Sequence, residues 1–196
     1  MNRRIKKISL FVVMAMMGCC RMSAQPVNAP ATERPRLVVG IVVDQMRWDY
    51  LYRYQKRYVE GGFRRLLNEG FSCENTRLPY VPSVTAIGHT CIYTGSVPSI
   101  HGIAGNNFVK DGKKVYCTDD ATVKPVGTTS DAGLMSPRNM WITTIGDEMK
   151  IASNGRAKVV GVALKDRASI LPAGHNPMAL SGLTTRQATS SPAPII

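Results

Sequence analysis

The amino-acid sequence predicts an α/β fold in which helices flank a parallel sheet. Two near-continuous runs of Val, Ile and Leu, at 36–43 and 158–164, lack polar alternation, which is typical of buried parallel strands. The segments between these runs carry apolar residues at helical spacing, and alternation of strands with helices favours parallel pairing. We expect this order: strand 36–43, a helix from 47, helix 63–68, a short strand that follows 70–76, helix 84–94, insertion 108–138, helix 139–151 and strand 158–164.

Residues 1–24 have the form of a secretory signal peptide. A basic stretch at 2–7 precedes an apolar core at 8–17, and small residues follow. The apolar core is too short to span a membrane, so we predict an exported protein, periplasmic or secreted, without a membrane span. A lipid anchor at Cys19 ranks second, and the proline-containing residues 25–35 form a linker.

The net charge of +12 does not indicate a nucleic-acid partner. The signal peptide holds five of the 25 Lys and Arg residues and no acid, which leaves 20 basic against 13 acidic residues, or +7. Outside it the sequence contains no concentrated Lys/Arg run and no nucleic-acid motif, so we assign the excess charge to solvated faces.

Three cysteines lie outside the signal peptide, namely Cys73, Cys91 and Cys117. An odd number in an export compartment allows one disulfide with one buried thiol, or no disulfide, and the spacing matches no zinc motif. We favour cysteines that serve packing.

Asp44 ends the first apolar run, at the carboxyl end of the predicted strand. Open α/β sheets bind ligands at this edge, and Asp is disfavoured inside strands. The carboxylate either caps the following helix or supplies an oxygen ligand to a metal such as zinc. The aromatic residues of that helix, Trp48, Tyr54 and Tyr58, are expected to pack against the sheet.

The stretch 79–107 holds a second candidate for chemistry. Two prolines keep the approach extended, and a helix then runs over 84–94 to a glycine stop. Ser83 or Thr85 lies where unpaired N–H groups and the positive helix end stabilise an anion. Each hydroxyl is therefore either a simple cap or a group that attacks or contacts phosphate.

The region after this stretch is polar and then helical. Residues 108–138 are rich in turns, with a hairpin turn at 110–113, and we expect an insertion over the active-site side rather than core. The next helix is expected over 139–151, with Trp141, Ile145 and Met149 on one face.

Lys165 and Arg167 follow the last apolar run, again at the carboxyl end of a strand. Residues two apart in an extended chain point the same way. The pair is either solvated or suited to the additional oxygens of a phosphate monoester dianion.

The segments 37–50, 79–107 and 163–175 together resemble the type I phosphodiesterase/nucleotide pyrophosphatase branch of the alkaline phosphatase superfamily. They are most similar to its secreted bacterial alkaline phosphatases with a Thr nucleophile, over 35–177 in unbroken order. The resemblance implies that residues 36–177 form the N-terminal part of an alkaline-phosphatase-like domain, with an incomplete parallel sheet.

The resemblance also implies the roles of individual residues. Thr85 would be the nucleophile and, with Asp44, a ligand of a site for two Zn²⁺. The groups that would contact the phosphoryl oxygens are Asn106, Lys165 and Arg167. Both His89 and His101 are structural in the family pattern.

The activity that the resemblance implies is zinc-dependent hydrolysis of small phosphate monoesters through a phosphothreonine intermediate. The Lys-x-Arg pair favours monoesters over the alternative, a phosphodiesterase or nucleotide pyrophosphatase. The family takes two further Asp and three His ligands from the second half of its chain, and after His101 this sequence has only His175. A non-catalytic, truncated product is therefore the other alternative.

Residues 178–196 are expected to be a frameshifted, non-homologous tail. The family-like pattern continues through 174–177 and then stops, and no strand or helix period follows. Codons permitted for this tail, shifted by one base, encode aromatic and turn residues like those that continue such phosphatases. A genuine polar tail is the alternative. On the frameshift hypothesis, the 196-residue chain is inactive and prone to aggregate through exposed apolar strands.

Overall fold

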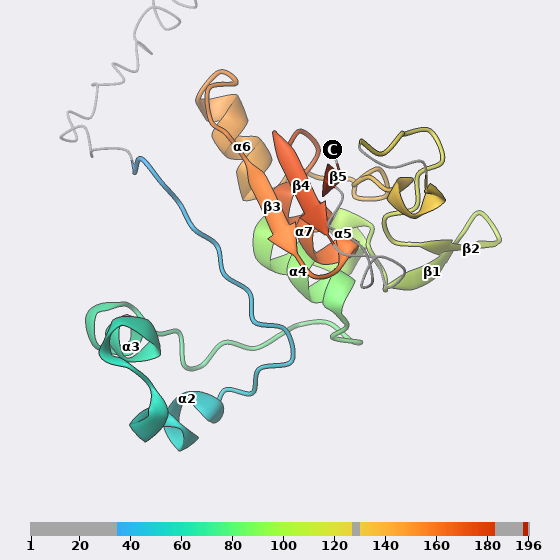
Figure 1. Cartoon of the computed structure of the whole chain (residues 1–196). Helices are drawn as coiled ribbons and strands as arrows, with labels where there is room; N and C mark the ends of the chain where they lie inside the picture. Colours follow the sequence, from blue (N-terminus) through green and yellow to red (C-terminus); the bar gives the residue numbers. More distant parts are fainter. Residues whose placement is uncertain (1–34, 127–129, 183–193, 196) are drawn as a thin grey trace, which may run out of the picture. The chain divides into compact units, whose positions relative to one another are not determined.

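The computed structural model describes residues 35–126, 130–182 and 194–195 (Figure 1). The predicted signal peptide with Cys19, most of the predicted linker and most of the predicted tail lie outside these residues. The chain divides into two units, one up to Ile41 and one from Val42 onward.

The predicted strand at 36–43 is not formed, which corrects the first element of the expected order. In the first unit Leu37 and Ile41 are each 78% exposed, and in the second Val43 is exposed as well. An apolar run becomes a strand only where a neighbouring strand pairs with its backbone. Of the described strands, none pairs with this segment.

The sheet of the second unit has the order β3-β4-β5, from Val160–Ala163, Ala179–Gly182 and Pro194–Ile195. The strands β3 and β4 are parallel, which confirms the predicted strand type at 158–164, and β5 is antiparallel to β4. Burial was predicted wrongly, since Val162 is 76% exposed and only Gly161 of β3 is buried. The strand β4 corrects the expectation that no regular element follows residue 177.

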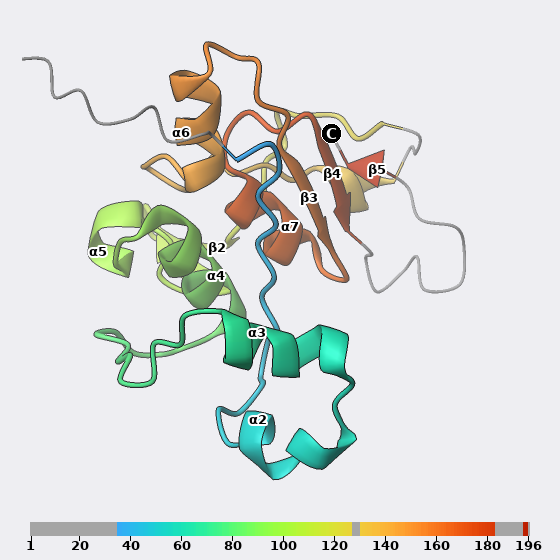
Figure 2. The ribbon, with the colours of Figure 1, turned by 90° about the vertical axis from the view of Figure 1, so that its left-hand side faces the viewer.

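Helix α7 (Asp166–Ala173) lies between this sheet and helix α4 (Thr85–Thr94), as the two ribbon views show (Figures 1 and 2). Close packing of α7 on β3 depends on Gly161, where an added Cβ would lie 2.5 Å from the Ser169 carbonyl oxygen. Both predicted ends of α4 are confirmed, and Gly95 closes it in the left-handed conformation with φ 64°.

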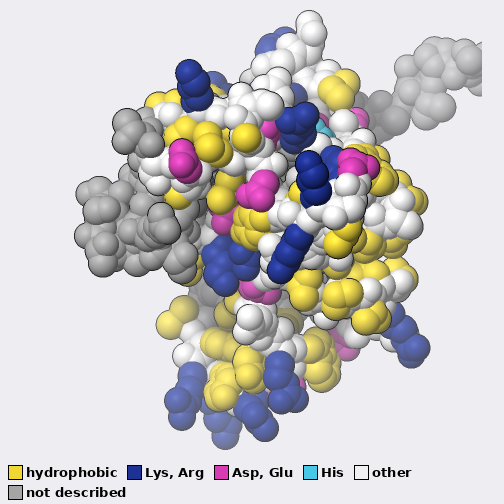
Figure 3. Space-filling model, turned by 90° about the vertical axis from the view of Figure 1, so that its right-hand side faces the viewer, with side chains coloured by type: hydrophobic (Ala, Val, Ile, Leu, Met, Phe, Trp, Pro, Cys, Tyr) yellow, Lys and Arg dark blue, Asp and Glu magenta, His cyan; other side chains and the backbone are white. Residues whose placement is uncertain are grey.

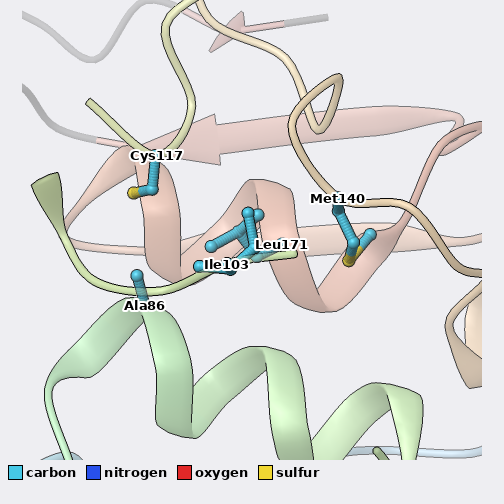
Figure 4. Packing of buried hydrophobic residues seen from close by; sticks show 5 residues of the cluster. All are labelled: Ala86, Ile103, Cys117, Met140 and Leu171. Carbon is cyan, nitrogen blue, oxygen red and sulfur yellow. The ribbon is translucent and has the colours of Figure 1, made fainter. Parts of the chain in front are cut away.

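The main core joins α4 to α7 and to the segments between them (Figure 4). A smaller cluster packs α7 on the sheet through Ile170, Ala173 and Leu180. Together the two clusters pack α4 and the sheet against α7, and both helix starts carry predicted site residues. The five residues of the main core are Ala86, Ile103, Cys117, Met140 and Leu171.

A hairpin follows short helix α5 (Pro98–His101) and pairs β1 (Asn107–Lys110) with β2 (Lys113–Tyr116). The predicted turn is confirmed, with Asp111 and Gly112 both at positive φ. The segment 108–138 was expected to stay outside the core. Residues Cys117 and Thr118 are nevertheless fully buried, and a 3-10 turn follows at Asp131–Gly133.

The three cysteines among the described residues, Cys73, Cys91 and Cys117, are free, so the option without a disulfide holds for them in this structure. Burial raises the pKa of the Cys117 thiol to about 12, which keeps it protonated. The packing role holds for Cys117, which belongs to the main core, whereas Cys73 is exposed.

The segment from 47 to 69 breaks into short pieces instead of one long helix and one short helix. Trp48 is 60% exposed, and hydrophobic side chains lie among Lys and Arg on the face shown in Figure 3. Helix α3 does end at Gly70 as expected, whereas the short strand expected after 70–76 is not formed. The pieces are α2 (Tyr50–Arg53), a 3-10 turn (Gln55–Arg57), a π-helical turn (Glu60–Arg64) and α3 (Arg65–Glu69).

Helix α6 (Ile145–Ala152) begins later than the helix predicted over 139–151. Thr144 is its N-cap, and a capping box with Asp147 fixes the start. Trp141 lies before α6, so it does not share a helical face with Ile145 and Met149 as predicted. The reciprocal cap decided the boundary, whereas the prediction rested on apolar spacing alone.

Asp147 also anchors the turn after α7. Its carboxylate accepts hydrogen bonds from the backbone N–H groups of Thr144 at 3.0 Å and His175 at 2.8 Å. The His175 ring lies between Asp147 Oδ2, at 3.1 Å, and the Met140 carbonyl, at 3.0 Å. An added Cβ at Gly174 would lie 2.3 Å from this carboxylate, so the turn requires glycine. His175 therefore serves the fold here.

Asp147→Asn should destabilise the fold at neutral pH by about 1–3 kcal/mol, because an amide NH₂ would face backbone N–H donors. Burial alone would raise the pKa of Asp147, but hydrogen bonds from Thr144 and His175 outweigh it and hold the pKa below its ordinary value. Ionised Asp147 thus stabilises the fold above the unfolded-state pKa of about 4, and this contribution disappears as pH falls through the lower folded-state pKa.

Chemical denaturation between pH 7 and pH 2 measures this effect. The variant should lose stability at pH 7 and show a shallower decline below pH 4 than the wild-type chain. Asp111→Asn is the matched control, because Asp111 is exposed in a turn whose left-handed conformation Asn tolerates. Equal acid slopes in the wild-type chain and Asp147→Asn would contradict the assignment.

Candidate active site

The start of α4 brings two of the predicted site residues into contact. The Thr85 hydroxyl donates a hydrogen bond to Asp44 Oδ2 at 3.0 Å. Val84 is the N-cap, and no side chain caps this helix, so neither Ser83 nor Thr85 acts as the cap. Asp44 does not cap the following helix either, since the N-cap of α2 is Asp49. The structure thus places a hydroxyl and a carboxylate together at a positively polarised helix end.

Asn106 belongs to the same group. Its Oδ1 accepts a hydrogen bond from the backbone N–H of Ala86 at 2.9 Å, in the first turn of α4. A carboxamide held through its oxygen presents its NH₂ group as a donor. Ala86 is fully buried. Its hydrogen bond therefore ties the Asn106 side chain to the packed first turn of α4, which also carries Thr85.

Two histidines support this group from inside the fold, in agreement with their expected structural role. His89 Nδ1 lies 2.8 Å from the Thr85 carbonyl oxygen. His101 is fully buried, accepts the Ile103 N–H at 3.1 Å and lies 3.2 Å from the Cys91 sulfur. Burial lowers the pKa of His101, which favours the neutral ring.

Lys165 and Arg167 belong to a second group at the start of α7. Lys165 is exposed and is the N-cap residue, whereas Arg167 is already helical, so the extended-chain argument for a shared direction does not apply. Arg167 Nη1 donates to the Tyr116 hydroxyl at 2.8 Å, and the guanidinium carbon lies 5.9 Å from the Tyr116 ring centre. The buried Asp166 accepts from Tyr116 at 3.0 Å and from Thr118 at 2.7 Å.

The β1–β2 hairpin links the two groups. Asn106 immediately precedes β1, and Tyr116 ends β2 opposite Asn107. The Cys117 N–H donates to the Asn106 carbonyl oxygen at 3.0 Å, which closes the base of the hairpin. Sequence reasoning missed Tyr116 and Asp166. The position of Asp166 between the predicted basic residues Lys165 and Arg167 was a signal that could have identified it.

The residues present fit part of a metal-binding shell. A carboxylate oxygen and a hydroxyl oxygen in contact, as at Asp44 and Thr85, are hard donors that zinc accepts. Protein zinc sites use at least three protein ligands. Among the described residues, no group of three or more His, Cys, Asp or Glu side chains could hold a metal ion.

Residues 38–170 match the type I phosphodiesterase / nucleotide pyrophosphatase family, and the chain belongs to this family.

Its relatives include alkaline phosphatase PafA of Elizabethkingia meningoseptica, 61% identical over 87% of this chain, and alkaline phosphatase PhoV of Synechococcus elongatus, 53% identical over 86%. A crystal structure of PafA in which one Thr, one Asn, one Lys and one Arg are substituted superposes with a TM-score of 0.73 and 62% identity over 78% of this chain. The chain spans 30% of PafA, 33% of PhoV and 29% of the solved chain. It therefore shows an incomplete part of the PafA fold.

Within residues 35–126, 130–182 and 194–195, no helix has the length and apolar character needed to cross a membrane.

Proposed function

We propose that the protein hydrolyses phosphate monoesters and that Thr85 is the nucleophile. The observation that carries the proposal is the contact of the Thr85 hydroxyl with Asp44, 3.0 Å apart, at the start of α4. A nucleophilic hydroxyl needs a group that favours its alkoxide form and an environment that tolerates negative charge. The first turn of α4 supplies the second of these through its N–H groups and dipole.

The reaction would proceed in two successive displacements at phosphorus. Thr85 Oγ1 forms a bond to phosphorus as the bond from phosphorus to the leaving oxygen breaks, which gives phosphothreonine and an alcohol. Water then cleaves phosphothreonine to inorganic phosphate and free Thr85. The NH₂ group of Asn106 and the cations of Lys165 and Arg167 would stabilise charge on the non-bridging oxygens.

Zinc is the metal proposed for the complete site, with Asp44 and Thr85 as two of its oxygen ligands. When bound, Zn²⁺ lowers the pKa of a coordinated hydroxyl and stabilises a leaving oxygen. The hydroxyl–carboxylate contact supports this proposal, because it brings two oxygen ligands from separate segments of the chain to within 3.0 Å of each other.

Two observations support monoesters as the substrate class. A monoester dianion carries one more charge than a diester, and Lys165 and Arg167 place two cations at the start of α7. The PafA variant above is altered at one Thr, one Asn, one Lys and one Arg. In this chain Thr85, Asn106, Lys165 and Arg167 are residues of the same four types in the same order.

A phosphodiesterase or nucleotide pyrophosphatase activity is the second candidate, and the description of the matched family favours it. A comparison of 4-nitrophenyl phosphate with bis(4-nitrophenyl) phosphate, in the active full-length gene product, decides between the two. We expect a higher kcat/KM on the monoester, loss of turnover with a chelator, and recovery with Zn²⁺. A diester preference would reject the monoester proposal, and full activity after metal removal would reject the zinc proposal.

The same assays on the 196-residue chain test the other alternative, a non-catalytic product. We expect no turnover from it, because Asp44 and Thr85 supply two oxygen ligands and no group of three or more His, Cys, Asp or Glu among the described residues could hold a metal ion. Turnover together with two bound zinc ions would contradict this expectation. Export to the periplasm or medium is proposed from the signal-peptide pattern, and cell fractionation tests it.

A further inference from the structure

Buried and half-buried residues around Arg167 form a hydrogen-bonded chain that none of the proposed catalytic steps uses. Thr118 Oγ1 donates to Asp166 Oδ2 at 2.7 Å, and the Tyr116 hydroxyl donates to Asp166 Oδ1 at 3.0 Å. Arg167 Nη1 then donates to the Tyr116 hydroxyl at 2.8 Å. The chain therefore runs from Thr118 through Asp166 and Tyr116 to Arg167.

The direction of each hydrogen bond follows from the chemistry of the groups. A guanidinium only donates and an ionised carboxylate only accepts, so the phenol must accept from Arg167 and donate to Asp166. Burial raises the pKa of the Tyr116 hydroxyl above its ordinary value, so the hydroxyl stays protonated at working pH. The fully buried Thr118 fixes the far end of the chain.

The Arg167 guanidinium is held through Nη1, whereas its Nε–H makes no hydrogen bond to the described residues. The Tyr116 ring lies 5.9 Å from its carbon, and Nη1 is bonded to the hydroxyl of that ring. The Arg167 Nε–H is buried and has no hydrogen-bond partner among the described residues. A planar fork with one nitrogen fixed can direct its other donors together at a phosphoryl group.

We propose that Tyr116 is a positioning residue, which holds the Arg167 guanidinium so that its remaining donors engage the non-bridging oxygens of the monoester. The inference rests on the proposed function, since it needs Arg167 to contact substrate. Tyr116 itself touches neither the phosphorus nor the leaving group. Tyr116 ends β2 opposite Asn107, next to Asn106. Its hydrogen bond with Arg167 therefore links the guanidinium to the segment that carries the Asn106 amide.

The test is Tyr116→Phe, which removes one hydroxyl and keeps the ring. In the active full-length gene product, kcat/KM on 4-nitrophenyl phosphate should fall about tenfold, the value of one hydrogen bond to a charged group. Loss on bis(4-nitrophenyl) phosphate should be less than about twofold, because a diester presents less charge to Arg167. In an Arg167→Ala background, Tyr116→Phe should cause no further loss on the monoester.

Tyr93→Phe is the matched control, because Tyr93 is also half-buried and burial alone raises its pKa. Tyr93→Phe should leave kcat/KM unchanged on both substrates. A purely structural role for Tyr116 would instead lower the two activities equally and act in the Arg167→Ala background as well. Either result would overturn the inference.

A second measurement does not depend on turnover. In the 196-residue chain, solvent exchange of the Arg167 Nε–H, followed by NMR, should accelerate in Tyr116→Phe and not in Tyr93→Phe. Unchanged exchange would overturn the inference. If Arg167→Ala leaves monoester turnover intact, the proposed role of Arg167 fails and the inference on Tyr116 fails with it. If Arg167→Ala reduces turnover and Tyr116→Phe does not, the inference alone fails.

Discussion

Thr85→Ala is expected to reduce hydrolysis of phosphate monoesters by at least about a thousandfold in the active full-length gene product, since no other group can take over a covalent step. The fold should be intact. Thr85 is the first residue of α4, its side chain caps nothing, and alanine has a higher helix propensity than threonine. Initial rates with 4-nitrophenyl phosphate and a thermal melt of each variant measure the two effects.

Ser83→Ala is the matched control, because Ser83 is a neighbouring exposed hydroxyl outside α4. It should retain wild-type turnover. The assignment of the nucleophile is wrong if Ser83→Ala abolishes turnover and Thr85→Ala does not. Phosphate incorporation from labelled substrate gives a direct check, since the wild-type protein can carry the label at Thr85 and the Thr85→Ala variant cannot.

Local sequence signals allowed one element of the candidate site to be predicted, whereas the roles of the site residues stay predictions. The helix over 84–94 has local signals at both ends, namely an extended proline approach and Gly95 in the left-handed conformation. Local signals of this kind act whatever surrounds them. The contact of Thr85 with Asp44 then joins two residues that were selected separately from the sequence.

Elements whose formation depends on distant partners were predicted poorly. The run at 36–43 has the composition of a strand, but strand formation needs a neighbour, and none of the described strands pairs with it. The same reason explains why Val162 in β3 is exposed, since an apolar pattern indicates that a face can be buried without indicating what covers it. Apolar spacing also misplaced the start of α6, which the Thr144 capping box determines.

Tyr116 shows a further limit of sequence reasoning. Its contacts with Asp166 and Arg167 bridge 50 and 51 positions of sequence. No local pattern marks a tyrosine at the end of a hairpin as the partner of an arginine at a later helix start. The turn at Asp111 and Gly112 predicted the hairpin, but only the packing of Cys117 in the core shows where its base lies.

Arg167→Ala should have the second largest effect on activity and should separate two substrate classes. We expect kcat/KM on a monoester to fall about a hundredfold and kcat/KM on a diester to fall about tenfold, because the monoester dianion carries the additional charge that a guanidinium stabilises. Lys165→Ala should show the same preference with a smaller loss, since the exposed Lys165 ammonium is screened by water.

Arg57→Ala is the matched control, because Arg57 is an exposed arginine in a 3-10 turn away from both groups in the sequence. It should change neither activity. Arg167→Ala also removes the donor to Tyr116, so a melting curve must accompany the kinetics. Arg167→Lys should restore the positive charge without restoring the planar, two-pronged donor geometry of the guanidinium. If the losses on monoester and diester were equal in Arg167→Ala and Lys165→Ala, these cations would not discriminate by substrate charge, and the preference for monoesters would need another cause.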